Sequence, residues 1–220
     1  MATMTDELRK NGAADKERSE VERVYYLIRD WMIASELAPG AFLSEPEIAE
    51  RCGTSRTPVR EALSRLVQDG WVDSIHRKGF QVRPVTLRDI SELFTYRRLF
   101  ERYAGERAAA TATSEHIAEL ESIVELEDRP NIPMKELSEL NERFHLALAY
   151  RTENQRIIGQ MRLIMAYTHR LNPLFLTFVD SISHREILQA VKLRDGVLAG
   201  SLMAEHVEFA LTMMIKSFCQ

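Results

Sequence analysis

One short segment constrains this chain more than any other. Residues 53–63 read GTSRTPVREAL, and they follow an apolar-periodic stretch that ends at Cys52. Gly53 is suited to stopping a first helix, and Ser55 is placed to begin a second, with Pro58 in the first turn, where a missing N–H costs little. Two short helices joined by a glycine turn form a helix-turn-helix, whose second helix docks in the major groove of DNA. The segment therefore predicts a DNA-binding unit.

The residues around this turn agree with that interpretation. Ser44 with Glu47 three residues later predicts a capping box at the start of the first helix. In the second helix the apolar residues recur at helical spacing and should face the core. Arg56, Thr57 and Arg60 lie off that stripe, at the end that a recognition helix presents to bases and phosphates. Either arginine is suited to reading a guanine.

A basic hairpin is predicted next. Within residues 71–84, two alternating segments surround a turn that contains Lys78 and Gly79, which predicts a β-hairpin wing touching the DNA backbone or minor groove. Residues 51–84 carry seven Lys/Arg against three Asp/Glu, although the whole chain has a net charge of -4. Single arginines most often lie on a solvated face, and a helix-turn-helix can serve protein packing. The combination, with positive charge concentrated here, favours DNA.

The rest of the chain reads as helices. One helix is expected from Ser19 to about Ser35, covering the helix-turn-helix, and residues 1–18 lack apolar periodicity, which predicts a disordered tail. Beyond residue 84 no β pattern recurs, and six amphipathic helices are expected near 86–111, 114–127, 133–150, 153–172, 183–194 and 195–218. The predicted fold is mainly α, with a winged helix-turn-helix domain over 19–84 and an all-α bundle over 85–220.

Composition limits the other possibilities. No run approaches ~18 apolar residues and the N-terminus is polar, so neither a membrane span nor a signal peptide is expected, and the protein should be cytoplasmic. Cys52 and Cys219 give neither a disulfide framework nor a metal motif. Residues 85–220 hold 16 Lys/Arg against 19 Asp/Glu, so the bundle is not a second nucleic-acid surface.

Histidines are the informative polar residues of the bundle. Asn141 and His145 are spaced i, i+4 and share a helix face, His184 opens the fifth bundle helix, and His206 lies in the middle of the sixth. Side chains with N or O donors that converge from three helices can hold a divalent cation. Alternatively, each histidine is a hydrogen-bonded core residue. The sequence alone leaves both interpretations open.

The N-terminal motifs resemble a known family. The segment LAPG at 37–40, LSE at 43–45, residues 55–63 and the Asp-Gly pair at 69–70 are similar to the winged-helix domain of the GntR superfamily of bacterial transcription regulators. The resemblance implies a homodimer that binds a palindromic operator. The positions it implies for DNA contact are Ser44, Ser55, Arg56, Thr57, Arg60, Lys78 and Gly79. Some relatives hold a further contacting arginine where this chain has Pro46.

The bundle resembles the FCD ligand-binding domain of the FadR-like branch, on looser motifs around Glu101, residues 141–145, 184–190 and 195–206. The expected number of bundle helices, six rather than seven, resembles that of its VanR-like subgroup. The resemblance implies a divalent transition metal, zinc or nickel first, and a small carboxylate effector. The metal ligands that it implies are Asn141, His145, His184 and His206.

Two features of this site are specific to the chain. Relatives more often hold Asp where this chain has Asn141, and an amide is a weaker ligand that leaves one more positive charge for an anionic effector. Arg97 matches an arginine that relatives direct into the pocket, and its planar fork suits a carboxylate; alternatively it forms a surface pair with Glu101. Tyr167 and His169 are candidates for the effector pocket, or are packing residues.

The function expected from these features is that of an effector-responsive transcription regulator, in this family most often a repressor, and not an enzyme. Effector binding would shift the bundle helices and alter operator affinity. Two alternatives are kept: a metal-independent sensor of a larger effector such as an acyl thioester, and a metal-dependent enzyme.

Overall fold

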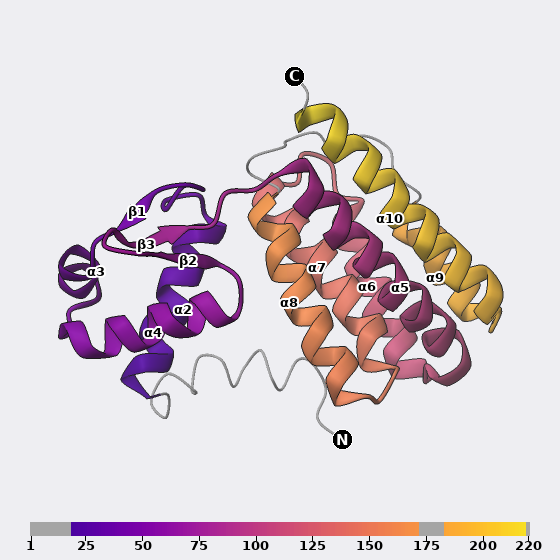
Figure 1. Ribbon diagram of the computed structural model, residues 1–220. Helices are drawn as coiled ribbons and strands as arrows, with labels where there is room; N and C mark the ends of the chain where they lie inside the picture. The colour runs from indigo at the N-terminus through magenta and orange to yellow at the C-terminus, as the bar shows by residue number, and fades with distance from the viewer. Residues whose placement is uncertain (1–18, 172–182, 219–220) are drawn as a thin grey trace. The chain divides into compact units, whose positions relative to one another are not determined.

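The computed structural model describes residues 19–171 and 183–218, and the chain divides into two compact units between Val85 and Thr86 (Figure 1). The tail predicted over residues 1–18 lies outside the described residues, as does Cys219.

The first unit contains the predicted helix-turn-helix and wing. Its elements are α2 (Glu20–Ile33), β1 (Phe42–Leu43), α3 (Glu45–Cys52), α4 (Arg56–Gln68), β2 (Val72–Ile75) and β3 (Gly79–Val82). Gly53 ends α3 with a left-handed φ of 64°, which only glycine adopts at little cost. The wing strands β2 and β3 are antiparallel, with Val72 opposite Val82. The two-residue β1 adds a third strand that the sequence does not predict, because two residues are too few to show alternation.

The hydrophobic core of this unit is built largely from the predicted apolar stripes of its helices. Trp71, Leu63 and Leu66 are fully buried together with Ile28 and Met32 of α2. Burying large side chains of this kind contributes about 1.5–3 kcal/mol each. The apolar stripe of α4 is therefore fixed inward, which leaves its basic face outward.

The predicted caps of the helix-turn-helix are only half right. Ser44 and Ser55 occupy the N-cap positions with extended backbone, but neither side chain makes a capping hydrogen bond. The capping box expected from Ser44 and Glu47 is therefore wrong; Ser44 directly follows β1 and keeps a strand-like ψ of 113°. By contrast, Ser19 caps α2 as expected, its hydroxyl accepting from the Glu22 N–H at 3.3 Å.

The second unit is the predicted all-α bundle. Its described helices are α5 (Leu87–Thr111), α6 (Ser114–Glu127), α7 (Met134–Tyr150), α8 (Gln155–Leu171), α9 (His184–Lys192) and α10 (Gly196–Phe218). Its apolar core draws on α5, α6, α7, α9 and α10. A capping box starts α5: the Thr86 hydroxyl accepts from the Asp89 N–H, and the Asp89 carboxylate accepts from the Thr86 N–H at 2.9 Å. The start of α5 is thus set by its own residues.

The long helices α5 and α10 run side by side (Figure 1). Their backbones approach so closely that a Cβ on Gly105 would lie 2.9 Å from the carbonyl oxygen of Ala199. Within the described residues, α10 is also the one helix long and apolar enough to cross a membrane by length and composition. It packs along α5 and carries the buried His206, and 33% of its most apolar 18-residue window is buried within the bundle.

Candidate metal centre and nucleic-acid interface

Three histidines of the bundle meet inside it. His145 comes from α7, His184 is the first residue of α9, and His206 lies in α10. All three are buried, and their ligand atoms lie within 4.8 Å of one another. Three helices whose histidines are up to 61 positions apart in the sequence thus place their imidazole rings in one cluster.

Two of these rings are backed by carboxylates. The Nδ1 of His184 lies 2.9 and 3.0 Å from the two carboxylate oxygens of Glu127, and the Nδ1 of His145 contacts Oε2 of Glu101. A carboxylate on Nδ1 keeps the proton on that nitrogen and leaves the Nε2 lone pair for a metal. The Nε2 of His184 is buried and has no hydrogen-bond partner among the described residues. Such an atom is costly to bury unless something binds it.

Arg97 completes the cluster. Its Nε contacts Oε1 of Glu101, and its Nη2 lies 3.1 Å from Nε2 of His145. Arg97 and Glu101 are 2% and 0% exposed. The pair with Glu101 that the spacing allows is therefore present, but the expectation of a surface pair is wrong. Both residues fall on the buried stripe of α5, in line with Phe94 and Ala104, so the helix carries them inward.

Burial and charge set the protonation of this cluster. Burial alone would raise the pKa of Glu101, but the charges of Arg97 and His145 outweigh it and hold the pKa at about 2. Burial lowers the pKa of His145 to about 4, with Glu101 opposing that shift and Arg97 adding to it. At neutral pH the carboxylate is ionised and the imidazole is neutral, which is the form that binds a metal.

The donor set fits a divalent transition metal. Three imidazole nitrogens, two of them oriented by carboxylates, suit zinc, nickel and related ions. Asn141 lies on α7 one turn before His145, on the same face, and is half-buried. Its position keeps it as a candidate fourth ligand.

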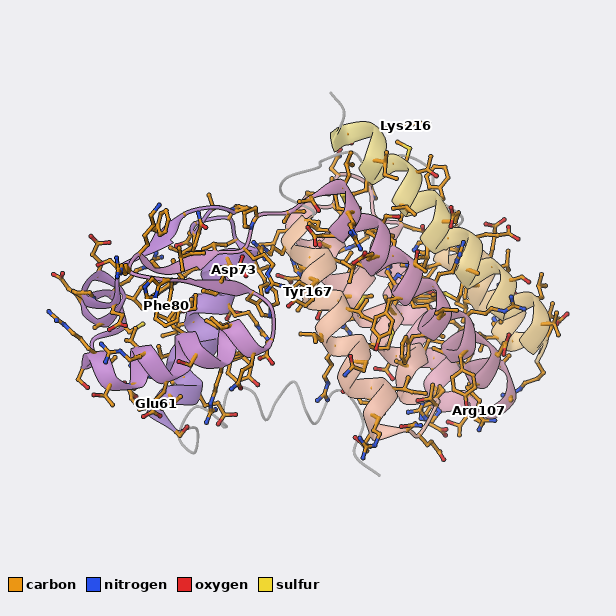
Figure 2. The ribbon with its side chains drawn as sticks, viewed as in Figure 1. Glu61, Asp73, Phe80, Arg107, Tyr167 and Lys216 are labelled. Atoms are coloured by element: carbon orange, nitrogen blue, oxygen red, sulfur yellow. The ribbon has the colours of Figure 1, made fainter. Side chains whose placement is uncertain are left out.

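The other predicted effector residues lie on α8. His169 contacts the Glu142 carboxylate through Nδ1 at 3.3 Å, which gives it a partner outside the histidine cluster. Tyr167 lies on α8, where Figure 2 labels it, and its burial is intermediate. Glu127 was not predicted, because its pairing with His184 joins residues 57 positions apart. The burial of Glu101 was not predicted either, although a charged residue on an apolar stripe was a usable signal.

Most of the predicted DNA-contacting residues are exposed on the first unit. Ser55, Arg56, Thr57 and Arg60 are exposed at the start of α4, Lys78 and Gly79 are exposed at the wing turn, and Ser44 is half-buried. Arg60 is not a loose side chain, because Glu45 at the start of α3 accepts from its Nε at 3.0 Å and from its Nη2 at 2.7 Å. This hydrogen bonding lowers the pKa of the Glu45 carboxyl. A two-pronged pair of this kind fixes the plane of the guanidinium.

Comparison with known proteins gives two family matches. Residues 20–82 match the family described as bacterial regulatory proteins, gntR family, and residues 92–209, more than half of the chain, match the FCD domain. The matches cover the winged unit and the bundle respectively.

Individual relatives match along most of the chain. The Nta operon transcriptional regulator of Aminobacter aminovorans is 29% identical over 193 residues, which cover 86% of this chain and 88% of the relative. The HTH-type transcriptional repressor RspR of Escherichia coli (strain K12) is 26% identical over 198 residues, or 85% of each chain. A solved transcriptional regulator GntR from Rhodococcus sp. RHA1 has a TM-score of 0.71 and 28% identity, over 90% of this chain and 99% of the other.

Proposed function

This chain belongs to the GntR family of bacterial regulators and carries an FCD domain, and we propose that it is a homodimeric repressor whose affinity for a palindromic operator is controlled by a small carboxylate effector. That it is a DNA-binding transcriptional regulator follows from the two family matches and the named relatives. The same matches confirm the expectation that it is not an enzyme. Regulation of this kind takes place in the cytoplasm.

Operator reading is assigned to the exposed start of α4. Arg56 and Arg60 would reach base edges, while Ser55 and Thr57 contact phosphates and Lys78 at the wing turn adds a backbone contact. Ser44 and Gly79 are assigned further contacts with the DNA backbone. The free hydroxyls of Ser44 and Ser55, which make no capping bond, support this role.

The observation that carries the effector site is the buried Nε2 of His184, which has no hydrogen-bond partner in the described part of the chain while Glu127 contacts the opposite ring nitrogen. We assign a divalent metal, zinc or nickel, to His145, His184 and His206, with Asn141 as the fourth ligand. When bound, the metal supplies a positive centre for a carboxylate. The chain's own part is to orient the rings, to keep His145 neutral and to bring the Arg97 guanidinium to the same place.

The chemistry of the cluster favours a small anion over a long acyl chain. Arg97, Glu101 and three histidines make its centre charged and hydrogen-bonding, and each of them is buried. An apolar acyl chain placed there would lie against these charged groups and would give the buried Nε2 of His184 no partner, which is costly. Tyr167 and His169 on α8 are proposed as further lining of the effector pocket.

The signal would travel through α5. This helix carries Arg97 and Glu101 and begins at Leu87, directly after the winged unit ends at Val85. An effector that pulls on Arg97 therefore acts on the same rigid element that the DNA-binding unit is tied to. A shift of α5 would change the spacing of the two winged units in a dimer and so the operator affinity.

The first test is the metal content of untagged protein purified without chelator or added metal, by elemental mass spectrometry. About one transition metal per chain is expected, falling to background in His145→Ala/His206→Ala, with His169→Ala as a matched control that keeps it. Unchanged metal in the double variant would refute the assigned ligands.

The second test is DNA binding. DNA fragments selected from a random pool should share a palindrome, and binding measured by fluorescence anisotropy should be lost in Arg56→Ala and in Arg60→Ala. The histidine double variant should still bind the selected DNA but should not respond to small carboxylates. Wild-type affinity in both arginine variants would refute the recognition helix.

A further inference from the structure

The nitrogen that the proposed metal needs on His145 is already engaged by the protein. The guanidinium of Arg97 has only donors, so at the 3.1 Å contact it must donate and Nε2 of His145 must accept. Because Nε2 accepts, the ring proton is on the other nitrogen, Nδ1, which contacts Oε2 of Glu101. The single lone pair of the ring is therefore directed at Arg97.

A metal and Arg97 cannot share that lone pair. Metal–imidazole bonds are about 2.0–2.1 Å long and lie along the lone pair, which is the direction that Nη2 of Arg97 occupies. The guanidinium is planar and moves as one group, so Nη2 leaves His145 only when the whole group turns, and another of its five N–H donors can then donate to Glu101. Arg97 can thus leave His145 while keeping its charge beside Glu101.

We propose that Arg97 is an internal competitor of the metal: its guanidinium caps Nε2 of His145, and metal binding displaces it and frees a charged donor inside the pocket. This inference rests on the metal site proposed above. It has a regulatory consequence, since the donor suited to a carboxylate becomes available only when the metal is bound. By linkage, a carboxylate that engages the displaced Arg97 must also strengthen metal binding.

The competition can be measured with zinc alone. Full-length protein is stripped with a chelator, the chelator is removed, and zinc affinity is determined by competition with a chromophoric indicator. Arg97→Met removes the competing donor and charge and is expected to bind zinc roughly 10- to 100-fold tighter, the range for losing a hydrogen bond to a charged group. Arg102→Met is the matched control, because Arg102 forms the same i, i+4 pair with Glu106 at an exposed position of α5. It should bind zinc as the wild type does.

A second variant guards against misfolding, because Arg97→Met leaves Glu101 without its cation. Arg97→Lys keeps a charge beside Glu101, and its ammonium ends one atom short of the position of Nη2. It should therefore also bind zinc more tightly than the wild type. Circular dichroism spectra establish which variants are folded.

The outcomes separate this inference from the function it rests on. Tighter zinc binding in either folded variant, with Arg102→Met unchanged, supports the competition. Zinc binding by the wild type with equal or weaker binding in the folded Arg97 variants overturns the competition and leaves the metal site standing. No zinc binding by any of these proteins overturns both.

Discussion

Acidification should destabilise the bundle through His145. In the folded protein, burial lowers the pKa of this imidazole from its ordinary 6.5 to about 4. Between these two pKa values the unfolded chain binds a proton that the folded chain does not, so the free energy of unfolding is highest above pH 6.5 and falls as the pH is lowered toward 4. Lowering the pH from 7.5 to 5.0 crosses about 1.5 pH units of this window, and at ~1.4 kcal/mol per pH unit the free energy of unfolding should fall by about 2 kcal/mol. Glu101, with its folded pKa at about 2, is ionised throughout this window.

The assay is urea unfolding of chelator-treated protein at several pH values. Both tryptophans, Trp31 and Trp71, lie in the first unit, so tryptophan fluorescence reports the unfolding of that unit. The loss of helical circular dichroism that is not accompanied by a fluorescence change then reports the unfolding of the bundle. His145→Gln cannot take up the proton, and its unfolding free energy should change less over this range, by about 2 kcal/mol. The same pH slope in this variant and in the wild type would refute the argument.

Three further perturbations test other parts of the structure. Glu45→Ala should weaken specific operator binding roughly tenfold in anisotropy titrations while non-specific binding persists, because Arg60 loses its fixed orientation. Glu47→Ala on the same helix is the control, and an equal loss of affinity in that variant would contradict a role for the Glu45–Arg60 pair. Glu127→Gln should weaken zinc affinity about 10- to 100-fold by removing the carboxylate behind His184, whereas Glu121→Gln, whose partner is Lys192, should leave it unchanged. Gly105→Ala should lower the thermal midpoint because its Cβ would meet Ala199 at 2.9 Å, while Gly159→Ala, with nothing within 4 Å, should raise it slightly; the reverse order would refute the close approach of α5 and α10.

Local signals predicted most of the fold. The bounds of the bundle helices follow capping residues and breaks that act over a few positions, and the expected starts and ends lie within about two residues of those in the structure. The failures are of another kind. Whether Ser44 makes its capping bond depends on the strand before it, and the two-residue β1 exists only because β3 lies beside it. Neither fact is encoded in a short window of sequence.

The candidate site was predicted as residue types rather than as geometry. The family resemblance, applied to histidines on three expected helices, identified the three residues that the structure brings together, but it did not predict that Glu101 and Glu127 lie behind two of the rings. Those contacts join helices far apart in the sequence, so periodicity carries no record of them. Arg97 shows the limit best, because an i, i+4 pair looks the same in sequence whether it is solvated or buried.

The capping box at Thr86 and Asp89 bears on how regulators of this kind diversify. Because α5 starts from its own hydrogen bonds, the junction at Val85 and Thr86 can be cut and rejoined by recombination without removing the signal that begins the bundle. A DNA-reading unit can then acquire a different sensing unit in one genetic event. The DNA specificity and the effector specificity of such a protein can therefore evolve independently of each other.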